Sequence, residues 1–426
     1  MTEGFYQTDF GYKLSYEIKG SGCEHVLFVM GFCCNKAYWG SCVDQIHALY
    51  PGKYTTCTYD QRGVGKSTDS WCHKTSSKTL ARDILGLLLH LNWIDRKIPL
   101  HLVGWSMGGF ACIEFIATIL NEMNHTLNIC SLTLANTGHK LTFPPAAGMY
   151  HGLMAIFKGF LSGIGYTRGR WVVPHAVSMH YSAKYLAEDD NRAALEAEYY
   201  NSRSPFDMPL IHRFRMLCGH FRAVLTHYVP EDRMKLIRES GLAMNAVVST
   251  DDVLIHPTAS INLANSLHCG FSYLDGGHMS HIEHMPDFIE ILTRLWDRGL
   301  GLKFPHMMRP VAHHVLTSKT FSAPDFQAEE MSLPRPMRSW PDDVDVKHML
   351  TKIMSRMDPE RLFNFERLKN PGRLILLPLL LSPLIIRMVS RIRRGDSSKG
   401  KLREVSVVLY VLLLLFLVQE TARVHG

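Results

Sequence analysis

A serine with one glycine two residues before it and another two residues after it is the strongest chemical signal in this sequence of 426 residues. The string Gly104-Trp105-Ser106-Met107-Gly108 follows an apolar run and precedes a helical pattern. A nucleophile in a sharp strand-to-helix turn lies on strained backbone, where glycines avoid the clashes that larger neighbours would cause. We therefore expect Ser106 to lie on such a turn, with its hydroxyl exposed for attack on a carbonyl.

Residues that could activate this serine occur later in the chain. A serine hydroxyl needs a histidine base, which is itself held by a carboxylate. Asp251 and Asp252 follow the apolar run 244–249, and His278 follows the run 271–274. We therefore predict that Ser106, one of these two aspartates and His278 act together as a catalytic triad.

The elements that must position these residues alternate along the chain. Helical patterns such as 81–91 lie between strand-like apolar runs at 25–30, 54–59, 100–103, 130–135, 244–249 and 271–274. Strands that alternate with helices predict right-handed crossovers and a mostly parallel sheet covered by helices on both faces. The sequence thus predicts an α/β fold.

Interruptions of this alternation divide the chain into regions. Residues 139–241 are helical in pattern and rich in Met and aromatic side chains, and we interpret them as a helical cap. The cap is inserted into a core of residues 1–138 and 242–300. Prolines break up the next region, which predicts a linker over 301–370. Residues 371–426 contain two apolar runs and form a separate tail.

Two further motifs complete a resemblance to a known superfamily. Residues 60–67 (DQRGVGKS) are similar to the turn D-x-R-G-x-G-x-S, and Met30-Gly31-Phe32 stand at the place of the loop H-G-x. With the glycine-flanked serine and the chain order Ser, Asp, His, these motifs make residues 4–300 resemble the α/β-hydrolase superfamily. The resemblance implies the α/β-hydrolase fold, with a mostly parallel sheet, helices on both faces and an inserted helical cap.

The resemblance also implies an oxyanion hole built from the backbone N–H groups of Phe32 and Met107. A methionine replaces the histidine that is usual in the H-G-x loop, which leaves the backbone donor in place. Ser249 stands where a glycine commonly opens the acid-bearing loop. Asp252 has the family's spacing, and Asp251 is the alternative carboxylate.

The implied chemistry is acyl transfer. His278 would take the proton of Ser106 as the hydroxyl attacks, Asp252 would hold the imidazole, and water would release the acyl-enzyme. We expect a serine hydrolase that cleaves an ester, and the tail and cap favour a lipid or another apolar acyl group. Thioesterases, peptidases, carbon–carbon bond hydrolases and cofactor-free haloperoxidases share the triad. A ligand-binding receptor or scaffold with little turnover is a rival from another class.

Other partners find little support in the sequence. No G-x-G-x-x-G or P-loop pattern follows a strand, so we expect no nucleotide cofactor. His278, His281 and His284 mimic metal-ligand spacing, but their positions drift around a helix without a Cys or carboxylate cluster, so we expect no metal. We expect a small-molecule or lipid ester as substrate, and no nucleic acid.

The net positive charge of the chain lies in its last 126 residues. Residues 301–426 hold 20 Lys and Arg against 12 Asp and Glu, whereas residues 1–300 hold 26 against 27. An apolar run begins at Val405 and ends at Val418, shorter than the ~20 residues of a typical spanning helix. We predict a membrane-associated tail in which this run inserts or spans and a basic segment binds anionic lipid. Two helices buried against the body are the alternative. The basic residues lie between the two apolar runs, at Arg387, Arg391, Arg393, Arg394, Lys399, Lys401 and Arg403.

Two further features favour a cytosolic location for the body. The first 20 residues lack the continuous apolar stretch of a secretory signal. The ten cysteines are scattered without paired spacing, which fits a reducing compartment. We therefore expect a membrane-associated protein whose catalytic domain faces the cytosol.

Overall fold

The computed structural model describes most of the first 301 residues and one later strand. It covers residues 1–301 and 312–315, with gaps at 9–10, 68–74, 95–96, 123–127, 142–143, 146, 149, 153–154, 156–172 and 199–209. The tail predicted over 371–426 and most of the linker predicted over 301–370 lie outside the described residues.

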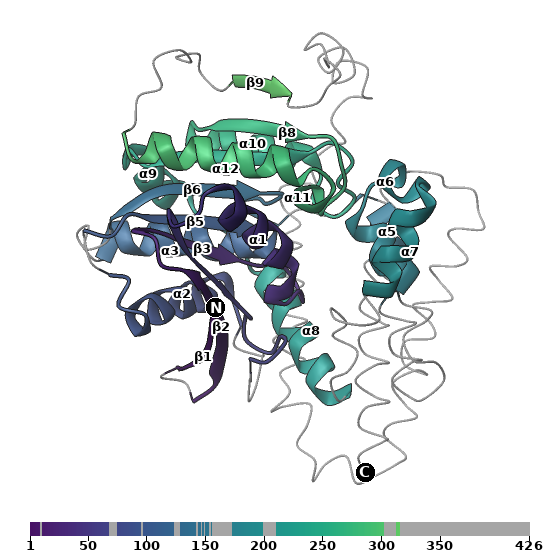
Figure 1. Cartoon of the computed structure of the whole chain (residues 1–426), viewed down its shortest axis with the longest axis horizontal. Helices are drawn as coiled ribbons and strands as arrows, with labels where there is room; N and C mark the ends of the chain where they lie inside the picture. The colour runs from purple at the N-terminus through teal and green to yellow at the C-terminus, as the bar shows by residue number, and fades with distance from the viewer. Residues whose placement is uncertain are drawn as a thin grey trace, which may run out of the picture.

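Nine strands of the described chain form one sheet (Figure 1). Their order across the sheet is β1-β2-β4-β3-β5-β6-β7-β8-β9. β2 pairs antiparallel with β1 and with β4, and the other neighbouring strands run parallel. The mostly parallel sheet predicted from the sequence is therefore confirmed. The strands are β1 (Thr2–Gln7), β2 (Lys13–Gly20), β3 (Glu24–Val29), β4 (Tyr54–Tyr59), β5 (Leu100–Trp105), β6 (Ile129–Ala135), β7 (Ala243–Ser249), β8 (Gly270–Leu274) and β9 (Ala312–Val315).

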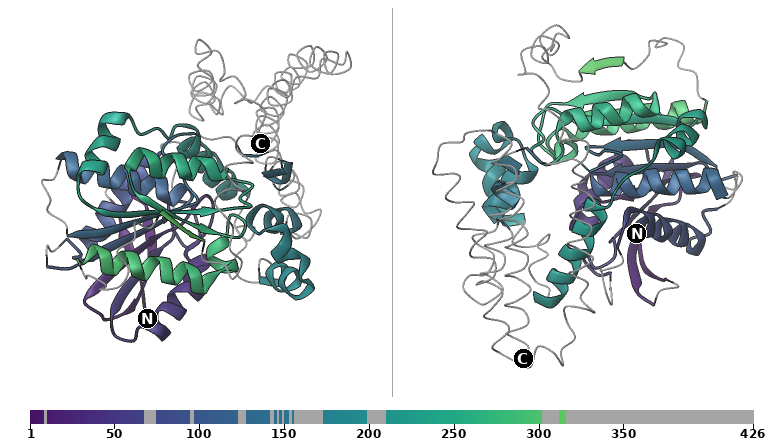
Figure 2. Two further views of the ribbon diagram at one scale, coloured as in Figure 1. Left: turned by 90° about the horizontal axis from the view of Figure 1, so that it is seen from above. Right: turned by 180° about the vertical axis from the view of Figure 1, so that it is seen from behind.

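Helices cover both faces of the sheet (Figure 2). Side chains of α2, α3, α9 and α10 pack in the hydrophobic layer on one face, and those of α1 and α12 pack in the layer on the other. The core helices are η1 (Lys36–Trp39), α1 (Gly40–Leu49), α2 (Ser77–His90), α3 (Met107–Glu122), α10 (Pro257–Leu267), α11 (Ser280–Glu283) and α12 (Met285–Gly299). The range predicted for the cap contains α5 (Val173–His180), α6 (Ala183–Ala187), α7 (Asp189–Glu198), α8 (Leu210–Leu225) and α9 (Glu231–Glu239).

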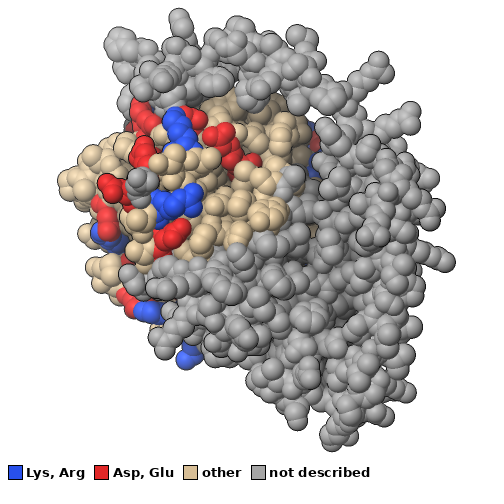
Figure 3. Space-filling model, turned by 90° about the vertical axis from the view of Figure 1, so that its right-hand side faces the viewer, with Lys and Arg blue, Asp and Glu red and all other residues tan. Residues whose placement is uncertain are grey.

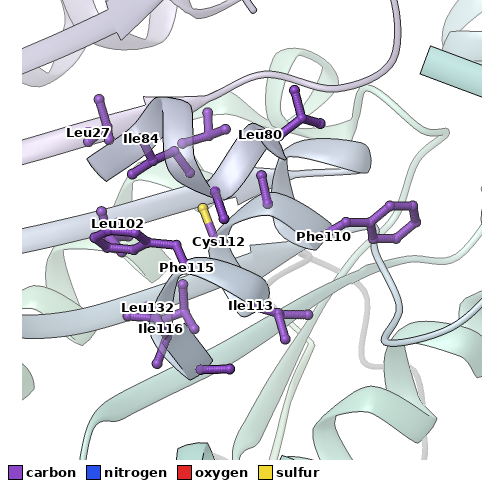
Figure 4. Packing of buried hydrophobic residues seen from close by; sticks show 14 of the residues in the cluster. Leu27, Leu80, Ile84, Leu102, Phe110, Cys112, Ile113, Phe115, Ile116 and Leu132 are labelled. Atoms are coloured by element: carbon purple, nitrogen blue, oxygen red, sulfur yellow. The ribbon is translucent and has the colours of Figure 1, made fainter. Parts of the chain in front are cut away.

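The central strand β5 shows why both faces need a cover. All six of its residues are buried. Leu102 packs in one layer with Ile84 of α2 and Ile113 of α3 (Figure 4), whereas Val103 packs in the opposite layer with Trp296 of α12. Successive side chains of a strand point to opposite faces, so a strand buried on both faces is continuously apolar.

The carboxyl ends of the central parallel strands meet at one edge of the sheet. Trp105 at the end of β5 pairs with Ala135 of β6, and Ala135 pairs with Val247 of β7. The loops that follow β5, β6, β7 and β8 therefore lie side by side. These loops carry the residues that the sequence singled out for chemistry.

The surface of the described residues carries mixed charge. On the face shown in Figure 3, basic and acidic side chains are interspersed, in keeping with the balanced counts for residues 1–300. None of the helices in the described ranges combines the length and the apolar character that crossing a membrane requires. The basic cluster and the apolar run that ends at Val418 lie outside these ranges.

Candidate active site

Ser106 lies on the sharp turn between β5 and α3. Its φ of 55° is in the left-handed region that non-glycine residues rarely adopt, as expected for a strained turn. The N–H of Ser106 donates to Ala135 O (2.8 Å), and its carbonyl accepts from Gly109 N (2.9 Å) and Thr137 Oγ1 (2.7 Å). The residue is only 7% exposed. This small exposed area follows from the residues on either side of the serine, which are almost fully buried. The exposure of the hydroxyl itself stays a prediction.

Close packing around this turn accounts for its glycines. A Cβ on Gly108 would lie 2.2 Å from the carbonyl oxygen of Val29 in β3. A Cβ on Gly31, in the loop that follows β3, would lie 2.9 Å from Cβ of Ser106. Neither position has room for a side chain, so the turn and the loop at Gly31 are in direct contact.

Asp252 and His278 form a buried pair. Nδ1 of His278 lies 2.6 Å from Oδ2 of Asp252, and the two residues are 2% and 4% exposed respectively. Oδ1 of the carboxylate accepts the N–H groups of Leu254 (2.7 Å) and Ile255 (2.9 Å). The carboxylate thus orients the imidazole and leaves its Nε2 for another partner. The alternative, Asp251, is exposed, and it is Asp252 that contacts His278.

Trp105 connects this pair to the turn that bears Ser106. Its indole Nε1 donates to the carbonyl of His278 (3.0 Å), and its ring lies 4.5 Å from the imidazole, centroid to centroid. Because Trp105 directly precedes Ser106, these contacts hold the histidine beside the turn. The structure joins Asp252 to His278 directly, and it links Ser106 to His278 through this neighbouring residue.

Asn136 is a site residue that the sequence analysis did not single out. It directly follows β6, is buried, and has a left-handed φ of 48°. Its Nδ2 donates to the carbonyl of His278 (2.8 Å), and its Oδ1 accepts from the N–H (3.0 Å) and Oγ (2.9 Å) of Ser249. The side chain thus ties together the ends of β6, β7 and β8. The sequence feature that could have identified this residue is an asparagine directly after a buried strand, because asparagine tolerates the left-handed conformation.

The two residues predicted for the oxyanion hole lie in the segments that meet at Gly31. Met107 is the first residue of α3, and a helix leaves its first N–H groups without intrahelical partners. Phe32 follows Gly31 and is half-buried, with its ring 4.9 Å from that of Phe221 in α8. Donors of this kind, aimed where negative charge develops, can stabilise a tetrahedral intermediate.

The motif at 60–67 supports the surrounding loops rather than the triad. The guanidinium of Arg62 donates two hydrogen bonds of 2.8 Å to the buried carboxylate of Asp83 in α2. Asp60 accepts the N–H groups of Lys36 (2.7 Å) and Lys66 (2.9 Å). These charge-assisted bonds are strong when buried, so they fix the loops that flank the site.

The histidines spaced like metal ligands do not gather at one point. His281 is buried, with its ring 4.8 Å from that of Trp39 and 5.5 Å from that of Trp105, while His278 pairs with Asp252. Within the described part of the chain, no three His, Cys, Asp or Glu residues form a cluster that could hold a metal ion.

Solved structures share this architecture. A hydrolase from Pseudomonas aeruginosa PA01 is 17% identical to this chain, with a TM-score of 0.52 over 70% of this chain and 98% of that one. A thermophilic esterase from Thermogutta terrifontis is 16% identical, with a TM-score of 0.53 over 70% and 99%. The enol-lactonase from Burkholderia xenovorans LB400 is also 16% identical, with a TM-score of 0.52 over 68% and 99%. At these identities the likeness shows the fold alone.

Comparison at the level of sequence families is more specific. No curated protein matches the chain. The model of the Alpha/beta hydrolase family matches residues 26–291, which is more than half of the chain and includes the loops that carry Ser106, Asp252 and His278. This protein therefore belongs to the Alpha/beta hydrolase family.

Proposed function

We propose that this protein is a serine hydrolase that cleaves a carboxylic ester. Ser106 is the nucleophile, His278 is the general base, and Asp252 orients the imidazole. The observation that carries the proposal is the buried pair of Asp252 and His278, held beside the strained turn that bears Ser106. Because Nδ1 of His278 faces the carboxylate, its Nε2 is left to accept the proton of a hydroxyl.

The reaction follows from these roles. As Ser106 Oγ attacks the ester carbonyl, its proton passes to Nε2 of His278, and the carbonyl oxygen becomes an oxyanion between the N–H groups of Phe32 and Met107. The imidazolium then protonates the leaving alcohol, which yields an acyl-enzyme. Water, deprotonated by the same histidine, attacks the acyl-enzyme and releases the acid.

We also propose that the acyl group is apolar, as in a lipid. A polar chain entering a site where Ser106 is only 7% exposed would lose its hydration, whereas an apolar chain gains from the same burial. The ring of Phe32 follows Gly31, which packs against the turn, and together with the ring of Phe221 it can offer such a chain apolar contacts. The composition of the cap supports the same substrate class.

The tail supports a third proposal, that residues 371–426 attach the protein to a membrane while the body faces the cytosol. The support lies in the sequence: seven basic residues from Arg387 to Arg403, followed by the apolar run from Val405 to Val418. Basic segments bind anionic lipid, and an adjacent apolar run adds a second signal for stable attachment.

A fluorophosphonate probe tests the catalytic proposal. The wild-type chain should be labelled once, with the adduct on the peptide that contains Ser106. Ser106→Ala should abolish labelling and hydrolysis of p-nitrophenyl esters, with an unchanged circular dichroism spectrum. Longer acyl chains should be preferred over acetate. Labelling that persists in the Ala variant would refute the nucleophile, and a wild-type chain that binds esters without turnover would favour the receptor alternative.

A further inference from the structure

His220 joins the cap to two loops of the core. It lies in α8 and is fully buried. Its Nδ1 lies 3.0 Å from the backbone N of Cys33, and its Nε2 lies 3.2 Å from the carbonyl oxygen of Arg62. Its ring also packs edge-on against that of Phe32, at 5.8 Å between centroids. One cap side chain thus contacts both the oxyanion loop and the motif at 60–67.

These two partners define the protonation state of the imidazole. A backbone N–H can only donate and a carbonyl can only accept, so Nδ1 is the acceptor and Nε2 carries the proton. Burial, together with the positive charge of Arg62, lowers the pKa of His220 to about 4, so the ring is neutral near pH 7. Protonation of Nδ1 would set an N–H against the N–H of Cys33 and break that contact.

Cys33 needs such a partner because its backbone is strained. Its φ is 55°, in the left-handed region that L-residues other than asparagine and aspartate seldom adopt. Such a residue persists only when its surroundings hold it there. The bond to His220 restrains Cys33 directly, and Gly31, two residues earlier, is packed against Trp105 and Ser106.

We propose that His220 is a positioning residue for catalysis, which holds Cys33 in its left-handed conformation and so fixes the N–H of Phe32 for the developing oxyanion. The bond also turns the N–H of Cys33 away from the substrate, which leaves that of Phe32 as the donor from this loop. His220 acts through the backbone and touches no reacting atom. The inference rests on the proposed function, because it assigns Phe32 to the oxyanion hole.

Two single substitutions separate the two hydrogen bonds of His220. In His220→Asn, the side-chain oxygen can take the place of Nδ1 and still accept from Cys33. In His220→Gln, the terminal amide can reach the place of Nε2 and donate to Arg62, while the contact with Cys33 is lost. His227→Asn is the matched control, because His227 is another buried histidine next to α8, and its ring bonds the carbonyl of Gly138 (3.2 Å).

The proposal predicts a split between kcat and KM. His220→Gln should lower kcat on a short-chain ester about 10²-fold, the scale of a lost oxyanion donor, with KM little changed. His220→Asn should retain kcat within about a factor of ten of wild type, since one missing hydrogen bond to Arg62 lies outside the oxyanion loop. His227→Asn should lower thermal stability and leave kcat unchanged.

A double variant tests the strain itself. Glycine adopts a positive φ without steric cost, so Cys33→Gly should remove the need for a restraint at this position. In the His220→Gln background, Cys33→Gly should therefore restore part of the lost kcat. Equal losses in His220→Asn and His220→Gln, with no rescue by Cys33→Gly, would show that His220 only attaches α8 and would overturn the proposal.

Amide hydrogen exchange at Cys33, measured by NMR on the full chain, keeps this inference separate from the catalytic one. The amide should be protected in the wild type and in His220→Asn, and exposed to exchange in His220→Gln. If the wild-type chain shows this protection but no turnover and no fluorophosphonate label, the proposed function fails while the restraint on Cys33 stands. If the amide exchanges equally fast in all three proteins, the restraint fails whatever the activity.

Discussion

At the scale of single residues, the contact between Asp252 and His278 leads to a direct comparison of two neighbouring carboxylates. Asp252→Asn should lower kcat about 10⁴-fold, because an amide no longer stabilises the imidazolium or holds the reactive tautomer. Asp251→Asn changes an exposed carboxylate one residue away and should leave kcat nearly unchanged. Steady-state ester hydrolysis by the two variants is the measurement. Equal or reversed effects would show that the acid has been misassigned.

Asn136 allows a second prediction at this scale. Asn136→Ala leaves the N–H of Ser249 without its acceptor and removes one of the two hydrogen bonds to the carbonyl of His278, which keeps the bond from Trp105, so we expect a loss of about 1–3 kcal/mol in the free energy of unfolding and a lower kcat. Asn245→Ala is the matched control, because Asn245 is also buried and bonds Ser272 Oγ (3.1 Å) inside the sheet. Urea unfolding and kcat should separate the two: both variants lose stability, and only Asn136→Ala loses turnover. An unchanged kcat in Asn136→Ala would remove the residue from the site.

The buried imidazole of His220 predicts how stability depends on pH. Its pKa is about 4 in the folded chain against 6.5 for an ordinary histidine, so the unfolded chain takes up the proton first as the pH falls. This contribution to stability is complete above pH 6.5 and is lost between pH 6.5 and 4, by at most about 3 kcal/mol. Urea unfolding across this range should show a shallower pH dependence for His220→Gln than for the wild type. Identical slopes would mean that the folded pKa is not depressed.

At the scale of elements, Glu283 of α11 joins the cap to the loop that carries His278. Its Oε1 accepts the N–H groups of Ser182 and Gly277 (2.9 Å each), and its Oε2 accepts from Ser182 Oγ (2.6 Å). Ser182 also caps the N-terminus of α6, and Gly277 directly precedes His278. One carboxylate therefore holds the start of a cap helix beside the residue that precedes His278.

Glu283→Ala should loosen this junction, because two backbone N–H groups lose their acceptor. We expect faster hydrogen exchange at Ser182 and Gly277, together with a lower kcat/KM. Lys184→Ala is the control: it breaks the exposed ion pair with Asp275 (2.8 Å), which links the same two segments but contributes little in water. If both variants behave alike, the junction depends on general cap packing rather than on this carboxylate.

The elements differ in how well the sequence predicts them. The runs that became β3 to β8 could be located because a parallel sheet buried on both faces needs continuous apolar segments. The antiparallel hairpin of β1 and β2 was not predicted, because its strands are largely exposed or half-buried and contain no continuous apolar run. The strand β9 lies within the range predicted as linker, where its four residues, AHHV, form too short a signal.

The residues of the site also differ in how well the sequence predicts them. Ser106, Asp252 and His278 could be proposed from the sequence because each stands after a strand-like run, and the structure places Asp252 and His278 in contact. Asn136 and His220 could not be proposed, because their partners are backbone atoms of residues far away in the sequence. Asn136 and His278 are 142 positions apart, and His220 is 158 positions from Arg62 and 187 from Cys33, so no local sequence pattern indicates these contacts.

At the scale of the whole molecule, the tail can be tested by deletion. A chain ending at residue 370 keeps the described body, loses the basic cluster and the apolar run, and should be found in the soluble fraction with its short-chain esterase activity intact. The full-length protein should sediment with membranes and resist both high salt and alkaline carbonate. Release by salt alone would show attachment through charge. Full-length protein in the soluble fraction at low salt would contradict membrane attachment and favour a tail packed on the body.

The position of the cap between β6 and β7 also affects synthesis of the protein. β6 ends at Ala135 and its parallel partner β7 begins at Ala243, more than 100 residues later. At about 5–20 residues per second, the ribosome needs roughly 5 to 20 s to make the intervening chain. During that interval the hydrogen-bonding edge of β6 has no β7 to pair with, and unpaired strand edges favour aggregation. We therefore expect chaperones that cover unpaired strand edges to help the nascent chain while the cap is being translated.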